Sequence, residues 1–299
     1  MVVVGAILIQ LALGAIYAWS VYTKPLVEAG WTRAQTQIVF SAGLAFFAIV
    51  MVIAGRMLLT VGPRKLAMAS GIVLGIGYIL AGIFGAENFV TTLIFVGIVG
   101  GSGIGLGYVV PIAVGIKWFP EKKGLITGLA VAGFGFGATL WMALADKLGP
   151  LGGGQMIKSM GISGTFIAFG IAYFILVIIG SLWMSFPPED WKPAGWNPSA
   201  PSGSKTVAPV KNFDSHEMLK TVQFYLILLT FAFGASAGLM SIGLMKLWPM
   251  VAMEANGIPK EVASASATLA MAVFFALCNG LGRILWGTIS DKIGRKLSI

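Results

Sequence analysis

The chain contains eight apolar stretches, each long enough to cross a lipid bilayer as a helix. They cover residues 2–21, 38–55, 66–84, 90–116, 124–144, 161–184, 222–244 and 262–282. About 20 apolar residues span the hydrocarbon core, where the backbone must satisfy its hydrogen bonds internally. The sequence therefore predicts an all-α integral membrane protein, and the 57% hydrophobic and 10% charged residues are typical of one.

The basic residues lie in the connections between these stretches. If the spans alternate in direction, thirteen Lys and Arg residues fall on one side of the membrane and six on the other. Such a bias indicates that the richer side is cytoplasmic. We therefore expect a multi-pass protein of the cell (inner, cytoplasmic) membrane with a cytoplasmic amino terminus. The formal charge of +9 is spread too widely to predict nucleic-acid binding.

One long polar connection divides the chain. Residues 185–220 contain six prolines among Ser, Gly and Lys, a composition that cannot bury enough apolar surface to fold alone. We expect an amino-terminal six-helix half at 1–184, a flexible cytoplasmic linker at 185–220, and the first two helices of a second half at 221–299.

An internal repeat predicts the complete architecture. Gly55 and Gly62 follow the second span, Gly287 and Gly294 follow the eighth, and both pairs are seven positions apart with basic residues after them. If these spans correspond, the repeat unit is six helices and the whole fold has twelve. We therefore expect a chain truncated at both ends to about eight transmembrane helices.

The second copy of the repeat carries a recognisable loop. Gly287, Asp291, Lys292, Gly294 and Arg295 occupy the pattern G-x-x-x-D-K-x-G-R-K, which resembles the cytoplasmic-loop signature of the major facilitator superfamily. Glycines allow a tight turn, and the aspartate can pair with basic side chains or with a helix terminus. We interpret these residues as a gating loop.

The first copy keeps only part of this pattern. Gly62 and Arg64 are present, but Leu59 stands where the superfamily has Asp, and Pro63 replaces a basic residue. We therefore expect the two gating loops to act asymmetrically.

Several segments together give a closer resemblance. Residues 14–22, 118–124, 132–137 and 217–224, together with Asn279-Gly280-x-x-Arg283, are similar to the oxalate:formate antiporter family, in the family's order. The resemblance implies a major facilitator superfamily fold of two six-helix halves. It also implies secondary transport of small carboxylates by alternating access, with Arg283 holding the carboxylate.

Arg283 is also singled out by its position. A charge within an apolar span costs about 3 kcal/mol on insertion scales, so it usually faces a polar pathway or a partner. With the amino terminus inside, its side chain leans toward mid-membrane, and Asn279 lies one turn earlier on the same face. A guanidinium matches a carboxylate bidentately. Structural pairing of Arg283 with the neighbouring half is the alternative.

Acidic residues are absent from all eight apolar stretches. Related monocarboxylate porters have an aspartate where this chain has Asn279, so Arg283 lacks a counter-ion in its own helix. This favours anion exchange, with a proton-coupled monocarboxylate symporter or a non-transporting anion receptor as alternatives. The stretches also lack His and contain only Cys278, so neither an enzyme, a metal site nor a cofactor is expected.

The resemblance also places Tyr17 and Tyr108 in the family's aromatic substrate pocket, with Trp19 as a further candidate. Phe134 stands where some relatives have a tyrosine, which removes one hydroxyl contact and counts against oxalate itself. Interfacial packing is the alternative for both tyrosines. Lys24 could attract anions at the outer mouth, although a solvated position at the end of a helix is favoured.

Two glycine-rich runs, 100–107 and 133–137, lie within apolar stretches. A nucleotide-binding glycine loop needs a preceding strand, so close helix packing explains them better. The expected partners are a small carboxylate anion and the lipid bilayer, and the protein is expected to be a monomer.

Overall fold

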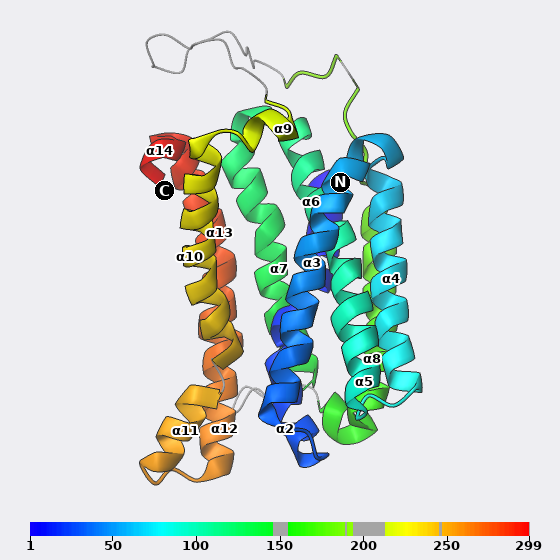
Figure 1. The fold of residues 1–299 in the computed structure, drawn as a ribbon, viewed down its shortest axis with the longest axis vertical. Coiled ribbons are helices and arrows are strands. Elements are labelled where there is room, and N and C mark those ends of the chain that lie inside the picture. Colours follow the sequence, from blue (N-terminus) through cyan, green and yellow to red (C-terminus); the bar gives the residue numbers. More distant parts are fainter. Residues whose placement is uncertain (146–154, 189, 194–212, 245–246, 299) are drawn as a thin grey trace. The chain divides into compact units, whose positions relative to one another are not determined.

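The computed structural model describes residues 1–145, 155–188, 190–193, 213–244 and 247–298, and every regular element within these ranges is a helix (Figure 1). The all-helical architecture expected from the sequence is thereby confirmed for this part of the chain.

Seven of the described helical segments are long and apolar enough to cross a membrane. They are Val2–Glu28, built from α1 (Val2–Leu13), η1 (Gly14–Trp19) and α2 (Ser20–Glu28); α3 (Arg33–Val61); α4 (Pro63–Ile83); Phe89–Trp118, built from α5 (Phe89–Thr92), η2 (Leu93–Gly100) and α6 (Gly101–Trp118); Pro120–Ala145, built from η3 (Pro120–Lys122) and α7 (Lys123–Ala145); α8 (Met156–Ser181); and Val222–Met240 within α10 (Val222–Leu244).

The stretch expected as the eighth span is helical as well. There α12 (Lys260–Leu269), η5 (Ala270–Phe275) and α13 (Ala276–Ile293) follow one another directly. Three short helices complete the described elements: α9 (Ser215–Met218), α11 (Leu247–Ala255) and α14 (Arg295–Ser298).

The chain forms two compact units. One contains Met1–Trp191 and Lys246–Ile299, and the other contains Lys192–Met245. The division into two halves joined by a linker at 185–220 stays a prediction, and most of that linker lies outside the described residues. All the candidate site residues named above belong to the first unit.

Local sequence explains how α3 begins and ends. The Thr32 hydroxyl accepts a hydrogen bond from the Gln35 backbone N–H at 3.2 Å, and the Gln35 side chain accepts one from the Thr32 N–H at 2.8 Å. This reciprocal capping satisfies two backbone donors at the first turn of α3. Gly62 then adopts φ 88°, a conformation that glycine takes without strain, and Pro63 starts α4 with its fixed φ.

Three of the long apolar segments are interrupted internally by 3₁₀ or π-helix. The first contains the 3₁₀ segment η1, which carries Tyr17, the fourth contains the π-helical segment η2, and the stretch expected as the eighth span contains the π-helical segment η5. Interruptions of this kind are frequent at functional sites and hinges. The sequence did not predict them, because their residues are apolar, as in an ordinary membrane helix.

Glycines bring the helices of the first unit into backbone contact. A methyl group on Gly75 of α4 would lie 2.9 Å from the Gly170 carbonyl oxygen of α8, and one on Gly101 of α6 would lie 2.5 Å from that of Gly43 in α3. Membrane helices associate through such close packing, since lipid supplies no hydrophobic drive between them. The structure thus agrees with the packing role expected for the glycines of the 100–107 run.

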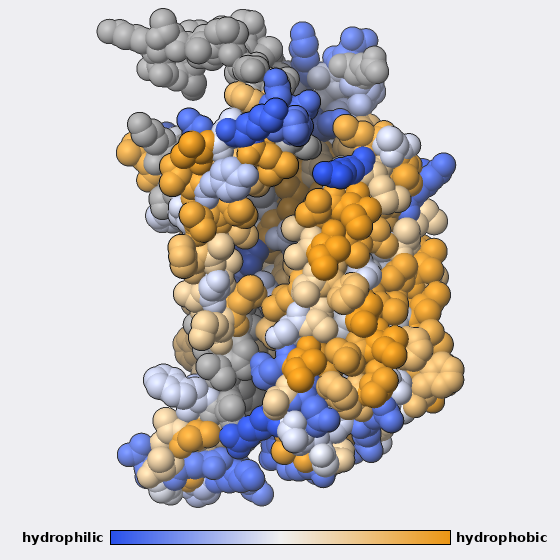
Figure 2. Space-filling model, in the orientation of Figure 1, coloured by the Kyte–Doolittle hydropathy of each residue, from blue (hydrophilic) through white to orange (hydrophobic). Residues whose placement is uncertain are grey.

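The surface of the first unit is arranged as a membrane protein requires. Figure 2 shows hydrophobic side chains over the middle of α3 and α4, with hydrophilic ones gathered toward both ends. Ile49, Val52 and Ile53 of α3 and Ile72 and Ile76 of α4 are exposed on these helices. An apolar band between two polar rims is what a lipid bilayer stabilises.

Candidate anion-binding site

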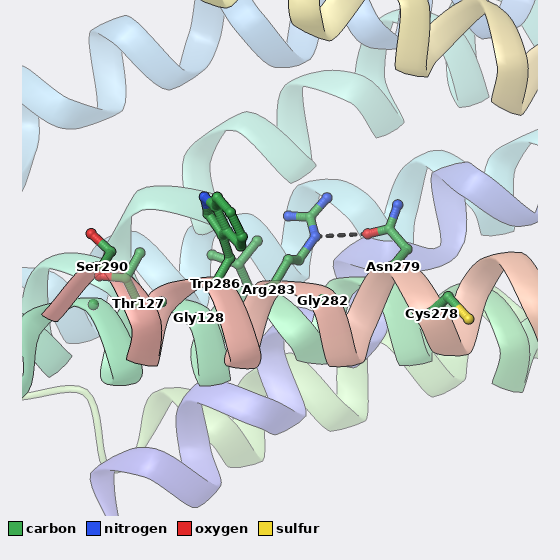
Figure 3. Close-up of a pocket in the computed structure, with 11 residues that line it drawn as sticks. Thr127, Gly128, Cys278, Asn279, Gly282, Arg283, Trp286 and Ser290 are labelled. Carbon is green, nitrogen blue, oxygen red and sulfur yellow. Dashed lines mark hydrogen bonds between the residues drawn. The ribbon is translucent and has the colours of Figure 1, made fainter. Parts of the chain in front are cut away.

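Arg283 lies on α13 and is half-buried. Its Nε donates a hydrogen bond to Oδ1 of Asn279, one turn earlier, over 2.7 Å (Figure 3). The bond uses one of the five guanidinium donors and leaves both terminal NH₂ groups for other partners. Because Oδ1 of Asn279 accepts this bond, its amide NH₂ is also left as a donor beside the guanidinium. The one-turn spacing read from the sequence therefore produces a direct contact.

Tyr17 and Tyr108 approach Arg283 from two other helices. Tyr17 comes from η1 and Tyr108 from α6, and the guanidinium lies close enough to each phenol to act on it electrostatically. The structure therefore brings together four of the five expected substrate-binding residues. Among the described residues, no carboxylate forms an ion pair with Arg283.

Trp19 is placed elsewhere. Its side chain is only 5% exposed, and its indole N–H donates to the Thr36 carbonyl oxygen at 2.9 Å. Its ring lies 5.8 Å from that of Tyr22, away from the Arg283 group. The indole thus fastens η1 to the first turns of α3, which is a structural task that its sequence position did not distinguish from ligand binding.

Phe134 of α7 joins the two tyrosines. Its ring centroid lies 4.9 Å from that of Tyr17 and 5.4 Å from that of Tyr108, with the rings nearly perpendicular in both pairs. Phe47 of α3 belongs to the same aromatic cluster, because its ring centroid lies 5.1 Å from that of Tyr108 and 6.3 Å from that of Phe134. Edge-to-face pairs are the preferred geometry of aromatic rings.

Sequence reasoning did not assign Phe47 or Gln10 to the site. Gln10 of α1 is fully buried, and its Nε2 donates to the Tyr108 carbonyl oxygen at 3.2 Å. Its spacing of seven residues from Tyr17, on one helix face, was a signal that could have marked it. Phe47 gave no such signal, because a phenylalanine in an apolar helix is equally compatible with lipid contact.

A cavity of about 560 Å³ opens beside the arginine. Figure 3 shows Arg283, Asn279 and Trp286 projecting from the same side of α13 into this space. The remaining lining residues come from α7 and α13 and are Gly124, Thr127, Gly128, Val131, Cys278, Gly282, Gly287 and Ser290. A volume of this size accommodates a small organic anion with water.

The Asp291 carboxylate meets the start of α7. Its Oδ1 accepts from the Gly124 N–H and its Oδ2 accepts from the Leu125 N–H, both at 2.8 Å. Unpaired N–H groups and the positive end of the helix dipole make this terminus a favourable site for a carboxylate. Of the two partners considered for the aspartate, the structure shows the helix terminus.

Backbone contact accompanies this bond. A methyl group on Gly124 or on Gly287 would clash with the carbonyl oxygen of the other, and one on Gly128 would clash with that of Arg283. The glycines therefore let α7 and α13 touch along the turns that lead from Asp291 to Arg283.

The other expected gating-loop residues lie at the ends of their helices. Gly294 adopts φ 85° and separates α13 from α14, while Lys292 and Arg64 are exposed. The side chain of Arg295 lies outside the described part. Leu59, where the first copy lacks the aspartate, is 75% exposed.

Within the described residues, no three His, Cys, Asp or Glu side chains gather closely enough to hold a metal ion.

Comparison with known families matches residues 2–299 to the Major Facilitator Superfamily. An uncharacterized MFS-type transporter of Escherichia coli is 28% identical over 98% of this chain and 66% of its own length. The oxalate:formate antiporter of Oxalobacter formigenes is 27% identical over 98% of the chain and 63% of its own. The apicoplast pyruvate carrier 1 of Toxoplasma gondii is 24% identical over 87% and 54%. The chain thus spans less than two thirds of the lengths of these relatives.

Proposed function

The chain belongs to the Major Facilitator Superfamily, and from this premise we propose that it serves the secondary active transport of small organic anions by alternating access. The substrate class is the small carboxylates, which include oxalate, formate and monocarboxylates such as lactate. Two of the similar proteins are named for carboxylates, an oxalate:formate antiporter and a pyruvate carrier, which supports this class.

The observation that carries the proposal is the set of donors around Arg283. The guanidinium and the Asn279 amide line the cavity, the Tyr17 and Tyr108 phenols lie close enough to the guanidinium to interact with it, and each of these groups can donate a hydrogen bond to an anion. A guanidinium held among apolar helices is costly unless a partner neutralises it. A carboxylate supplies that partner and matches the guanidinium through two parallel bonds.

Exchange of anions fits this chain better than cotransport with protons. None of the eleven Asp and Glu residues falls within the eight apolar stretches, so these stretches provide no carboxylate that could relay a proton. The site then turns back to the first side of the membrane most readily with a second anion bound to Arg283, because the occluded state is costly with an unpaired charge.

The gating role is assigned to the junction between α7 and α13. With the amino terminus in the cytoplasm, Asp291 lies at the cytoplasmic ends of both helices, and its two bonds to Gly124 and Leu125 hold these ends together. The working unit is a monomer in the inner membrane.

Counterflow into vesicles tests the proposal. Purified full-length protein is reconstituted in vesicles loaded with unlabelled oxalate, formate or lactate, and entry of the same labelled anion is followed. We expect Arg283→Lys to lower the initial rate at least tenfold, since a lysine cannot reproduce the bidentate geometry. Arg33→Lys is the matched control, because Arg33 is exposed at the start of α3. Unchanged counterflow in Arg283→Lys and Arg283→Ala would refute the assignment.

A further inference from the structure

We propose that Phe134 is a positioning residue, whose ring holds the Tyr17 and Tyr108 hydroxyls beside Arg283 so that the three groups bind one carboxylate together. The inference rests on the proposed function and deepens it, since it assigns the orientation of the two tyrosine hydroxyls to a residue that does not itself contact the ligand.

Phe134 is buried and does not line the cavity beside Arg283. Its side chain is 1% exposed, and neither it nor the two tyrosines is among the residues that line the space beside Arg283. Both tyrosines lie close enough to the guanidinium to interact with it electrostatically, whereas Phe134 acts on a ligand held by Arg283 only through them. Any effect of Phe134 on ligand binding has to pass through the side chains that it contacts.

The ring of Phe134 contacts both tyrosines. Tyr17 and Tyr108 pack against it from two different helices, at interplanar angles of 82° and 90°. A tyrosine hydroxyl lies at the far end of its ring, so a small rotation about χ1 displaces it widely. Phe134 opposes that rotation in both tyrosines at once, and Phe47 supports Tyr108 from α3.

Close backbone contacts hold Phe134 itself in place. A methyl group on Gly14 of η1 would clash with the Phe134 carbonyl oxygen, and one on Gly137 of α7 would clash with that of Leu11. These contacts fix the backbone of α7 directly against α1 and η1. Gln10 of α1 in turn bonds the Tyr108 carbonyl oxygen, which fixes the third helix of the group.

Ordinary core packing predicts something different. A phenylalanine that only fills space would destabilise the fold when truncated, and its effect on ligand affinity would not depend on the tyrosine hydroxyls. A positioning residue acts through those hydroxyls, so its contribution to affinity should disappear once they are removed. A thermodynamic cycle separates the two roles.

The cycle uses four proteins in lipid nanodiscs: the parent, Phe134→Leu, the double variant Tyr17→Phe/Tyr108→Phe, and the triple variant. Dissociation constants for formate, lactate and oxalate are measured separately by calorimetry. We expect Phe134→Leu to weaken the binding of the preferred anion at least fivefold in the parent and less than twofold in the double variant. Equal weakening in both backgrounds, or none in the parent, would overturn the inference.

Two further variants guard against a folding artefact. Phe169→Leu truncates a comparably buried phenylalanine that packs on Trp141 and Tyr173, and it should leave affinity within twofold. Phe134→Met introduces an unbranched, flexible side chain that can adapt to the space left by the ring, and the same cycle is measured with it if Phe134→Leu does not fold. A loss of affinity in Phe169→Leu as large as that in Phe134→Leu would count against positioning.

Measurements on the parent protein separate a failure of the positioning role from a failure of the proposed function. If it binds one of the anions and the cycle is additive, the positioning role alone is wrong. If it binds none of the three and shows no counterflow, the proposed function is wrong and this inference is wrong with it.

Discussion

At the scale of single residues, anion binding depends on whether a neighbouring side chain neutralises the charge of Arg283. Asn279 accepts a bond from Arg283 without neutralising it, so the guanidinium keeps its full charge for a ligand. An aspartate at the same position would supply a carboxylate within the helix, and an anion would then have to compete with it. The difference between an amide and a carboxylate at residue 279 should therefore set the affinity for anions.

Asn279→Asp tests this point. We expect the variant to bind the preferred carboxylate at least tenfold more weakly, a change of about 1.4 kcal/mol in binding free energy. Asn279→Ala is the comparison, since it removes the 2.7 Å bond but adds no charge, and its loss should be smaller. Calorimetric dissociation constants in nanodiscs provide the measurement. An Asn279→Asp variant with undiminished affinity would show that Arg283 does not act as the anion's counter-charge.

Single residues of the site differ in how well the sequence alone identifies them. Arg283 could be found from its position alone, because a charge inside an apolar span is rare and costly. Tyr17 and Tyr108 were identified only through a family resemblance, since a tyrosine within a span is equally typical of packing. Trp19 was predicted on the same grounds and lies elsewhere, held by the Thr36 carbonyl oxygen.

At the scale of elements, the contact between α7 and α13 joins the aspartate at one end to the arginine further along. Gly124, Gly128 and Gly287 permit it, because each position has a backbone atom of the other helix where a side chain would begin. Glycine spacing in the sequence predicts that some helices pack closely, but it does not say which. The partners of these glycines depend on the tertiary fold, and so does the choice of a helix terminus as the partner of Asp291.

Gly287→Ala should separate the two helices. The added methyl group would clash with the Gly124 carbonyl oxygen, and such overpacking costs about 1–3 kcal/mol. Gly282→Ala, one and a half turns earlier on the same helix, meets nothing within 4 Å and should be neutral or stabilising by about 1 kcal/mol through helix propensity. Thermal unfolding of the two variants in the same detergent compares them. Equal melting temperatures would show that the close approach of α7 and α13 does not stabilise the protein.

At the scale of the whole first unit, two cavities lie toward opposite ends of the helices. The one beside Arg283 extends along α7 and α13 to Gly124 and Ser290. The other, of about 650 Å³, lies among the ends of α2, α8 and α12, and it is lined by Lys24 and Lys158 together with Glu28, Glu87 and Glu261. Lys24 thus faces acidic side chains as well as basic ones, so this cavity does not form a purely attractive mouth for anions.

Alternating access requires that the two ends open in turn, and Asp291 should influence both. Asp291→Asn weakens the bonds to the amino terminus of α7, because the side chain loses its charge and one of the two oxygens that accept from Gly124 and Leu125. A change of about 1.4 kcal/mol shifts an equilibrium between two states tenfold. The variant should therefore populate states that are open at the Asp291 end.

The accessibility of the two cavities can be followed with native Cys278 and with the substitution Ser264→Cys. Cys278 is exposed and lines the cavity beside Arg283, while Ser264 lines the other. Labelling by a membrane-impermeant maleimide is timed for Cys278 in the native background and for Ser264→Cys in a Cys278→Ser background. We expect Asp291→Asn to speed the labelling of Cys278 from the side of the membrane at which Asp291 lies and to slow that of Ser264→Cys from the opposite side. Glu217→Gln, at an exposed position before α10, is the control and should change neither rate. If both rates rise together, Asp291 only loosens the structure, and a reciprocal gate between the two ends is ruled out.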